Sequence, residues 1–496
     1  MDFPAAVQPH ARALAANPAL YVDGEWIEGA GEAQPVIDPA CGAELGRVSA
    51  ASLAQVERAI LAARRTFDSG VWSRQAPAAR AAVLRRLHAL MSEHGEALIE
   101  LFIVEGGCPR SLARSLNMAQ PLEHLTWIAG RAEAGPVGGW LQPLATDPWA
   151  GTKGFIEREP YGVVSAFTPY NVPYIAYVWK VAMALAAGCS ICLLPSPRAQ
   201  LSALAFVRLI ERAGVPAGVV NLLFGGPPVG RMLADHDEVD MVTFTGSNSV
   251  GAEVMRLAAR TAKRVLLELG GKSPNVLLPG TDFSVAALPS LRRLFRNAGQ
   301  GCAVTSRILV AREDYARFVK IARETLPQIR VGDPWQEDSW VGPLISSEHR
   351  QRVEHAVADA VAHGARIEAG GGRPEGLPAG YYMNPVLLGG VDNTSAIAQT
   401  ELFGPVGVLI PYGSLDEAAF IANQSRYGLN ANIWGEEAEA VAFARRIRSG
   451  NVSINGGGAQ RADVSFGGYR QSGTGGEGGE RGFEEFLQFK HIVVPA

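Results

Sequence analysis

The stretch from Gly162 to Leu267 constrains the fold more than any other part of this 496-residue chain. Short apolar runs recur along it, and the segments between them have the composition and length of helices. The expected strands are 163–167, 190–194, 219–223, 241–244 and 265–267, and the expected helices are 174–187, 201–213, 229–234 and 248–259. Strands that alternate with helices in this way predict a parallel, doubly wound α/β sheet.

A second strand–helix alternation follows Glu268, so two sheets are expected, and a chain of this length is too large for one core. The predicted strands are 275–278, 308–310 and 408–412, the predicted helix is 314–326, and regular structure is expected to resume at Val341. Before Gly162, strands and turns are expected over 21–48, helices over 51–69 and 75–94, and further helical structure to about residue 130.

The segment from Glu133 to Thr152 differs from its surroundings. It is rich in glycine and proline, carries Trp140 and Trp149, and has no helical period. A loop this long and apolar needs a partner surface. The stretch 483–494 near the C-terminus is short and β-like.

The composition excludes several classes of protein. With 47% hydrophobic and 19% charged residues, it is typical of a globular protein. The net charge of −4 gives no reason to expect nucleic acid or an anionic membrane as a partner. No apolar run approaches the ~20 residues of a membrane-spanning helix. Residues 1–18 lack the long apolar core of a signal peptide.

The five cysteines are scattered along the chain at Cys41, Cys108, Cys189, Cys192 and Cys302. This distribution predicts a reducing compartment, the cytoplasm, without a disulfide framework. Cys189 and Cys192 have CxxC spacing, but they lie in a strand-like apolar run, so we expect no redox role there. We also expect no metal site.

Three short motifs carry chemistry. Cys302 stands among glycines in Asn297-Ala-Gly-Gln-Gly-Cys-Ala-Val-Thr-Ser-Arg307, where unpaired backbone N–H groups would favour a thiolate. Glu268 opens Glu-Leu-Gly-Gly-Lys-Ser-Pro-Asn, and Asn171 follows Thr-Pro-Tyr. Together they supply a nucleophile, a carboxylate base and an amide donor. These are the groups needed for covalent chemistry on a carbonyl.

These ordered motifs, with others extending from Tyr21 to the C-terminus, make the chain resemble the NAD(P)-dependent aldehyde dehydrogenase superfamily. The resemblance implies two doubly wound parallel-sheet domains and a small β oligomerisation element, in a homodimer or homotetramer. The implied dinucleotide-binding domain is 1–131 with 151–267, the oligomerisation element is 132–150 with 483–496, and the catalytic domain is 268–482.

The resemblance also implies a catalytic role for each of several residues. Cys302 would attack the aldehyde carbon, the Asn171 amide and the Cys302 backbone N–H would hold the oxyanion, and Glu268 would activate water. Lys180 and Glu477 match positions that relay protons with that glutamate in relatives. Glu477 follows Gly476, where relatives usually have arginine, and this weakens the match.

For the cofactor, the first turn of the predicted sheet carries no GxGxxG, a fingerprint that this family lacks. Phe244-Thr-Gly-Ser-Asn-Ser-Val-Gly is a strand, a glycine turn and a helix start, a natural pyrophosphate site. The resemblance assigns cofactor contacts to Thr168, Pro169, Tyr170, Leu194, Ser196, Gly226, Gly246, Ser247, Leu269, Glu401 and Phe403.

One departure affects the choice of cofactor. Leu194 and Pro197 stand where relatives usually have the lysine and glutamate that hold the adenosine ribose. Without that glutamate, nothing in this segment repels a 2′-phosphate, and Arg198 lies nearby. The cofactor is therefore expected to be NAD or NADP.

The substrate tunnel implied by the resemblance is roomy beside the cysteine, partly aromatic and polar at its mouth. Its residues are Val172, Trp179, Arg296, Gly301, Ala303, Gln460 and Phe466. This mixture predicts a medium-sized hydrophobic or aromatic aldehyde. Two alternatives stay open: a CoA-acylating relative, which Glu268 argues against, and a catalytically silent structural or binding member, which the intact Cys302, Asn171 and Glu268 argue against.

Overall fold

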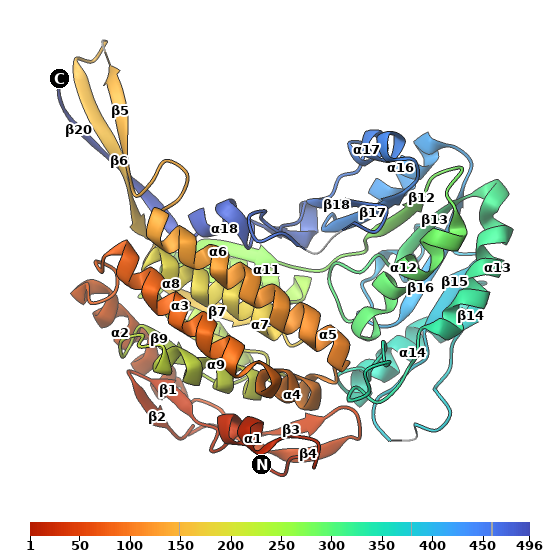
Figure 1. Cartoon of the computed structure of the whole chain (residues 1–496), viewed down its shortest axis with the longest axis horizontal. Helices are drawn as coiled ribbons and strands as arrows, with labels where there is room; N and C mark the ends of the chain where they lie inside the picture. Colours follow the sequence, from red (N-terminus) through yellow and green to blue (C-terminus); the bar gives the residue numbers. More distant parts are fainter. Residues whose placement is uncertain (148, 378, 458–459) are drawn as a thin grey trace.

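The computed structural model describes residues 1–147, 149–377, 379–457 and 460–496. Two large sheets lie side by side, and a narrow three-stranded sheet extends away from the body (Figure 1). Both large sheets are mainly parallel and carry helices on their faces, which confirms the predicted α/β fold class. Within the described ranges, no helix combines the length and apolarity needed to cross a bilayer.

The first sheet contains all five strands expected between Gly162 and Leu267, and these five are mutually parallel. Three antiparallel strands flank them. The order across the sheet is β19 (Gly473–Thr474), β11 (Arg264–Glu268), β10 (Met241–Thr245), β7 (Val163–Thr168), β8 (Ser190–Pro195), β9 (Val220–Leu222), β1 (Leu20–Val22) and β2 (Glu25–Ile27).

Two groups of helices pack on this sheet. One group is α2 (Leu53–Ser69), α10 (Pro227–Asp235) and α11 (Asn248–Ala258). The other is α7 (Pro173–Tyr177), α8 (Met183–Ala187) and α9 (Gln200–Arg212), which a further layer covers (Figure 1). That layer is α1 (Pro9–Ala15), α3 (Pro77–Glu93), α4 (Gly95–Gly106), α5 (Arg110–Arg114) and α6 (Gln120–Ala134).

The second sheet is parallel except for one antiparallel edge strand. Its order is β14 (Arg366–Gly370), β15 (Val386–Gly389), β16 (Val406–Tyr412), β13 (Arg307–Ala311), β12 (Pro274–Leu277), β17 (Asn430–Trp434) and β18 (Asn451–Ile454). The helices of this half are α12 (Phe283–Phe295), α13 (Tyr315–Thr325), α14 (Ser347–Ala362), α15 (Ala396–Gln399), α16 (Leu415–Asn423) and α17 (Glu437–Ala444). The last helix, α18 (Gly479–Glu484), packs on α8 in the first half.

Two expectations about this half were incomplete. The pattern did not predict α12, which contains Pro289 in its interior and leads directly to the Cys302 loop. At Val341 the structure has only a single bridge to Val331, and the next regular element is α14. Two further strands, β3 (Ala33–Asp38) and β4 (Ala43–Ser49), form a separate hairpin.

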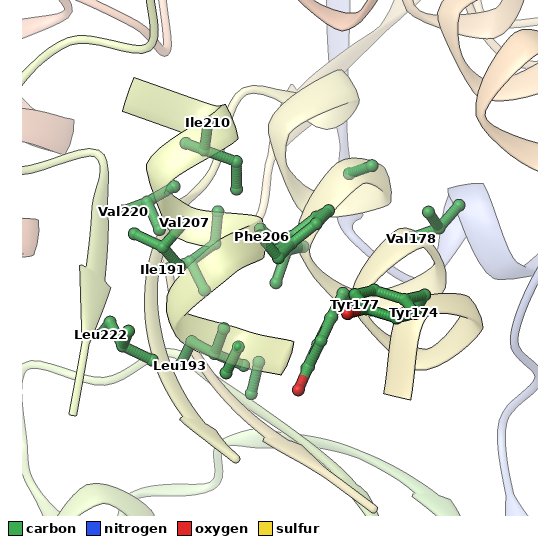
Figure 2. Close-up of a cluster of buried hydrophobic side chains, with 14 of the residues drawn as sticks. Tyr174, Tyr177, Val178, Ile191, Leu193, Phe206, Val207, Ile210, Val220 and Leu222 are labelled. Carbon is green, nitrogen blue, oxygen red and sulfur yellow. The ribbon is translucent and has the colours of Figure 1, made fainter. Parts of the chain in front are cut away.

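The core of the first half fixes the helix that follows Asn171. Figure 2 shows side chains of α7, β8, α9 and β9 packed together, among them Tyr174, Tyr177, Leu193 and Phe206. The rings of Tyr177 and Phe206 stack with their centroids 5.0 Å apart. Because closely packed protein interiors move little, this packing holds the segment 173–187 rigidly against the sheet.

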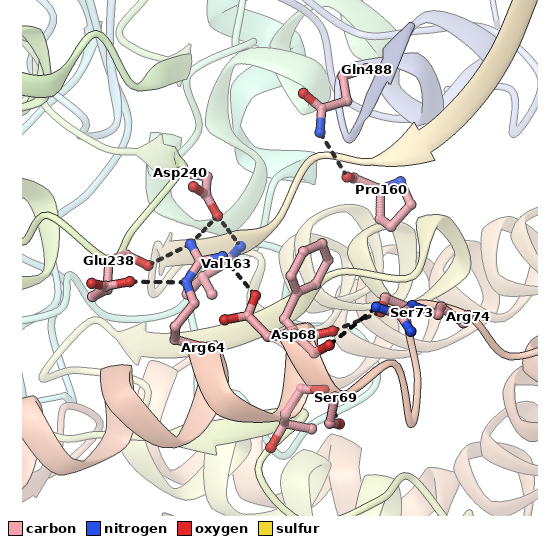
Figure 3. A network of polar contacts seen from close by, with 12 residues as sticks. Arg64, Asp68, Ser69, Ser73, Arg74, Pro160, Val163, Glu238, Asp240 and Gln488 are labelled. Carbon is pink, nitrogen blue, oxygen red and sulfur yellow. Dashed lines mark hydrogen bonds and ion pairs between the residues drawn. The ribbon is translucent and has the colours of Figure 1, made fainter. Parts of the chain in front are cut away.

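A polar network fixes the start of β7 (Figure 3). Asp240 accepts a hydrogen bond of 2.7 Å from the Val163 N–H. It also forms an ion pair with Arg64, and Arg64 forms a second ion pair with Glu238. At Gly162, φ is +138° and an added Cβ would lie 1.9 Å from the Asp240 carboxylate. Only glycine fits this position without displacing Asp240.

The narrow sheet consists of β20 (Leu487–Pro495), β6 (Thr152–Pro160) and β5 (Leu141–Asp147), in that order. Its strands therefore extend through Pro160, beyond the predicted boundary at residue 150. The two tryptophans differ: Trp140 packs on Phe483 and under Arg80, whereas Trp149 is 98% exposed. The body of the same chain thus covers Trp140, and of these two tryptophans only Trp149 lacks a partner surface.

We expect this sheet to be an interface between copies of the chain. Phe489 and Val493 on β20 are 59% and 49% exposed. Apolar side chains on a sheet that extends into solvent are typical of an interface with a partner. Phe489→Asp with Val493→Asp should reduce the oligomer to monomers in sedimentation velocity. Phe420→Asp, which changes an exposed phenylalanine on α16, is the control. A parent protein that sediments as a monomer at micromolar concentration would contradict the expectation.

Candidate active site

The Cys302 loop is a tight turn between α12 and β13. Asn297, Ala298 and Gly299 all lie in the left-handed region, with φ of 50°, 55° and 70°. A Cβ at Gly299 would lie 2.2 Å from the Gly404 carbonyl oxygen, so this position requires glycine. The turn leaves Cys302 partly exposed, and it brings the Cys302 carbonyl so close to Gly271 that a side chain there could not fit.

Asn171 is tied to the cysteine loop. Its buried side-chain Nδ2 donates a hydrogen bond of 3.0 Å to the carbonyl of Gln300. The Gln300 side chain is in turn fixed, since it donates to the Asn297 and Pro343 carbonyls and accepts from the Ile345 N–H. One amide hydrogen of Asn171 is left over. The Cys302 backbone N–H forms no hydrogen bond with the described part of the chain. Two donors are thus available beside the thiol.

Glu268 ends β11, and its carboxylate is 2% exposed. Neither of its oxygens has a hydrogen-bond partner among the described residues. Burial raises the pKa of Glu268 well above its usual range, and the nearby carboxylate of Glu477 raises it further, while Lys180 and Arg481 act in the opposite direction. The Glu268 carboxyl is therefore suited to exchanging a proton, and it does not serve as a structural ion-pair partner.

Lys180 and Glu477 form a buried ion pair behind Glu268. Lys180 lies in a π-helical turn, Val178–Ala182, and donates to the Thr243 hydroxyl at 2.8 Å. Glu477 is held opposite Phe466 by two backbone hydrogen bonds of 2.6 Å. π-Helical turns are frequent at functional sites. The structure thus brings together Glu268, Lys180 and Glu477 from three distant parts of the sequence.

The environment of the thiol differs from the sequence expectation. Burial raises the pKa of Cys302 above its ordinary value, and the carboxylates of Glu401, Glu268 and Glu477 add to this, whereas Arg296 lowers it. These surroundings therefore oppose the thiolate that the loop was expected to favour. The free N–H is present, but burial beside three acidic groups outweighs it.

Glu401 lies on the other side of the cysteine loop, against the Gly270–Gly271 turn that follows Glu268. It accepts a hydrogen bond of 3.0 Å from the Gly271 N–H, and a Cβ at Gly270 would lie 2.4 Å from its second oxygen. Burial raises the pKa of Glu401 to about 7. Phe403 follows with a left-handed backbone, and its ring packs edge-on against Tyr170.

The other predicted cofactor residues gather at the carboxyl ends of the parallel strands of the first sheet, where doubly wound folds bind ligands. Thr168 ends β7, Leu194 and Ser196 lie at the end of β8, and Gly226 precedes α10. Gly246 follows β10, and the Ser247 hydroxyl accepts from the Val250 N–H at 3.5 Å, capping α11. The remaining members, Pro169, Tyr170 and Leu269, extend the same edge.

Two features of this edge are compatible with a polar ligand such as a dinucleotide. The hydroxyls of Thr168 and Thr245 are buried and have no hydrogen-bond partner among the described residues. A bound polar ligand would supply the missing partners. A Cβ at Gly246 would lie 2.5 Å from the Phe244 ring, so the chain passes closely over the strand end before α11 begins. The α11 N-terminus can then present N–H groups to a phosphate.

The predicted tunnel has an aromatic wall. The rings of Trp179 and Phe466 stack, with centroids 5.8 Å apart and planes 24° apart. Val172 caps α7 below Asn171, Gly301 and Ala303 flank the cysteine, and Arg296 ends α12. These residues are all at least partly exposed except Trp179.

Sequence reasoning missed two polar residues of this wall, Gln120 and His124 of α6. His124 Nδ1 accepts from the Trp179 indole at 2.9 Å, while its Nε2 donates to the Gln460 carbonyl at 3.2 Å. Gln120 donates to the same carbonyl at 3.4 Å. Burial lowers the pKa of His124, so it is neutral at physiological pH. No local motif marks these residues, because only the fold places α6 over this loop.

The chain is similar to known proteins over nearly its whole length. It matches the profile described as the Aldehyde dehydrogenase family over residues 26–492. It is 39% identical to 3-succinoylsemialdehyde-pyridine dehydrogenase from a Pseudomonas species, covering 96% of this chain and 98% of that protein.

Two solved structures share the fold. Betaine aldehyde dehydrogenase from Staphylococcus aureus, in complex with NAD+, has a TM-score of 0.94 at 34% identity, covering 98% of this chain and 97% of that one. A cysteine-to-alanine mutant of Aldehyde Dehydrogenase C from Pseudomonas syringae, complexed with NAD+ and octanal, has a TM-score of 0.92 at 39% identity, covering 99% of both chains. This chain therefore belongs to the aldehyde dehydrogenase family.

Proposed function

We propose that this enzyme oxidises an aldehyde to the carboxylic acid through a thiohemiacetal and a thioester on Cys302. One observation carries the proposal: the thiol, the Asn171 amide and the unpartnered Glu268 carboxyl converge from three segments of the chain. None of the three forms an ion pair with another described residue, so all remain available for chemistry.

In the first step, the Cys302 sulfur attacks the carbonyl carbon, and the proton of the partly exposed thiol passes to water. The Asn171 amide and the Cys302 N–H would hold the resulting oxyanion, each donor stabilising the transition state by about 3 kcal/mol. A nicotinamide cofactor, when bound, accepts the hydride released as the thioester forms. Glu268 then takes a proton from water as the water attacks the thioester, and the acid and the free thiol are released.

The buried Lys180–Glu477 pair supports Glu268 in this scheme. A carboxyl enclosed by protein needs a route for its proton, and Glu477 lies close enough to raise its pKa. We propose that Lys180 and Glu477 relay protons to and from Glu268.

The cofactor would lie along the edge described above, with its pyrophosphate at Ser247 and the start of α11. Glu401 and Phe403 would hold the nicotinamide end. The solved relatives contain NAD+, and we propose NAD for this enzyme, with NADP also accepted. Leu194 is 7% exposed, Pro197 is exposed, and neither can hydrogen-bond a ribose through its side chain.

We expect cofactor selectivity to be weak, with less than about tenfold discrimination between NAD and NADP, because no acidic side chain from this segment repels a phosphate. Leu194→Lys with Pro197→Glu should tighten NAD binding by about 10- to 100-fold, since hydrogen bonds to charged groups contribute about 1.5–3 kcal/mol. Titration of both cofactors against parent and double variant measures this. Strong NAD selectivity in the parent would show that another part of the chain holds the ribose.

For the substrate, the stacked Trp179 and Phe466 favour a medium-sized hydrophobic or aromatic aldehyde. The octanal bound by the Pseudomonas syringae relative is consistent with such a tunnel. A panel of aldehydes with NAD or NADP, with and without CoA, tests the proposed function by absorbance of the reduced cofactor. Turnover only with CoA would support the acylating alternative, and none in either condition would support a silent member.

The remaining assignments are also proposals. The first sheet and its helices would form the dinucleotide-binding domain, the second the catalytic domain, and the narrow sheet the oligomerisation element of a homodimer or homotetramer. We also infer a cytoplasmic location. The five cysteines support it, since the structure leaves them as free thiols and buries Cys108, Cys189 and Cys192.

A further inference from the structure

Two arginines at the end of α12, Arg293 and Arg296, lie half-buried without a counter-charge. Neither guanidinium has a carboxylate within ion-pair distance in the part of the chain that the structure describes. Arg293 donates one hydrogen bond of 3.1 Å to the Ser453 hydroxyl. Arg296 forms no side-chain hydrogen bond to the described residues. Partly buried charges are normally paired, because an unpaired charge loses hydration without compensation.

The two guanidiniums also lie close enough to repel each other. Burial and, to a smaller extent, the charge of Arg296 lower the pKa of Arg293 to about 10. Burial likewise lowers the pKa of Arg296. Arg293 therefore stays charged at neutral pH, and the described residues supply no carboxylate that pairs with the end of α12.

The end of α12 leads into the loop of the nucleophile, and the charge of Arg296 acts on that thiol. Arg296 is the cation that acts on the Cys302 thiol, and it also acts on the buried Cys108. The cations that act on Glu401 are Lys272 and Arg426, and those that act on Glu268 are Lys180 and Arg481. Arg296 directly follows the last residue of α12, six residues before Cys302, and both residues are partly exposed.

We propose that Arg296, with Arg293 behind it, binds an anionic group of the substrate, so that the preferred aldehyde carries a carboxylate or a phosphate at its far end. This rests on the proposed function and narrows its substrate class. The forked guanidinium suits both anions, and the Trp179–Phe466 wall would contact the apolar part between the two ends. A cationic aldehyde, such as the betaine aldehyde of the Staphylococcus relative, is disfavoured at a positive centre.

A substrate series tests the proposal. We would compare kcat/KM for ω-oxo carboxylates of increasing length with their methyl esters, with phosphorylated aldehydes and with betaine aldehyde. The anionic members of matched length should exceed the neutral ones by about 10- to 100-fold, as charged hydrogen bonds predict. Betaine aldehyde should be the poorest substrate. Equal or better use of neutral or cationic aldehydes would overturn the anion site, while their turnover would still support the proposed oxidation.

Substitutions at the end of α12 test whether Arg296 causes the preference for anionic aldehydes. Arg296→Gln should reduce the anionic-to-neutral ratio of kcat/KM by about 10- to 100-fold, mainly through KM, and Arg296→Lys should recover part of it. Arg292→Gln removes the same charge from the exposed side of α12 and should leave the ratio unchanged. A ratio unaffected by Arg296→Gln would overturn the assignment.

Calorimetric binding of a dicarboxylate product tests the same site without turnover. The parent should bind it, Arg296→Lys should bind it more weakly, and Arg296→Gln should lose about 10- to 100-fold in affinity. If no aldehyde were oxidised but the dicarboxylate bound in this pattern, the proposed function would fail and the anion site would stand. No binding to the parent would overturn the anion site.

Discussion

Cys302→Ala is expected to abolish aldehyde oxidation, lowering kcat by about 10⁴-fold or more, because no other group can form the covalent intermediate. Cys108, Cys189 and Cys192 are buried, and burial raises the pKa of each thiol. Cofactor binding should persist, since the proposed dinucleotide edge lies on the other sheet. Reduced-cofactor absorbance measures turnover, and fluorescence titration measures cofactor binding.

The matched control is Cys41→Ala, which removes an exposed thiol near Asp38, outside the site. It should turn over at the parent rate. Turnover retained by Cys302→Ala would remove this cysteine as the nucleophile, whereas loss of cofactor binding as well would indicate damage to the fold.

Glu268→Gln should separate the two halves of the reaction. Acylation should still occur, but deacylation should slow by about 10²- to 10⁴-fold, because water then lacks its base. A burst of reduced cofactor followed by a slow steady state is the expected stopped-flow trace. Glu437→Gln, an exposed glutamate on α17, is the control and should show no such change. A variant at Glu268 that turns over at the parent rate would mean that another group activates water.

The same residue predicts a pH dependence. A base must be ionised, and the pKa of Glu268 is raised by burial and by Glu477. Deacylation by the parent should therefore fall as the pH drops through this raised value, at a higher pH than for an exposed glutamate. This limb of the pH profile should be missing in Glu268→Gln.

Local sequence was sufficient to predict the parallel strands of the first sheet, since each is a short apolar run bounded by turns. It was insufficient for α12, where Pro289 interrupts the helical pattern while tertiary packing overrides local propensity. The three motifs identified Cys302, Glu268 and Asn171, because each has a distinctive local sequence.

Properties that depend on distant residues could not be predicted from the sequence. The raised pKa of Cys302 arises from burial beside Glu401, Glu268 and Glu477, which only the fold brings together. The missing counter-charge at Arg296 is likewise visible only when every neighbouring element is in place. His124 became a candidate only when its bond to Trp179 was seen.

Intact-protein mass spectrometry of Glu268→Gln, mixed with aldehyde and oxidised cofactor and quenched in acid, tests the central claim most directly. The expected result is one added acyl group per chain, located by peptide mapping on Cys302 and removed by hydroxylamine. An unmodified protein despite a burst of reduced cofactor, or an acyl group on any other residue, would contradict a thioester mechanism at Cys302.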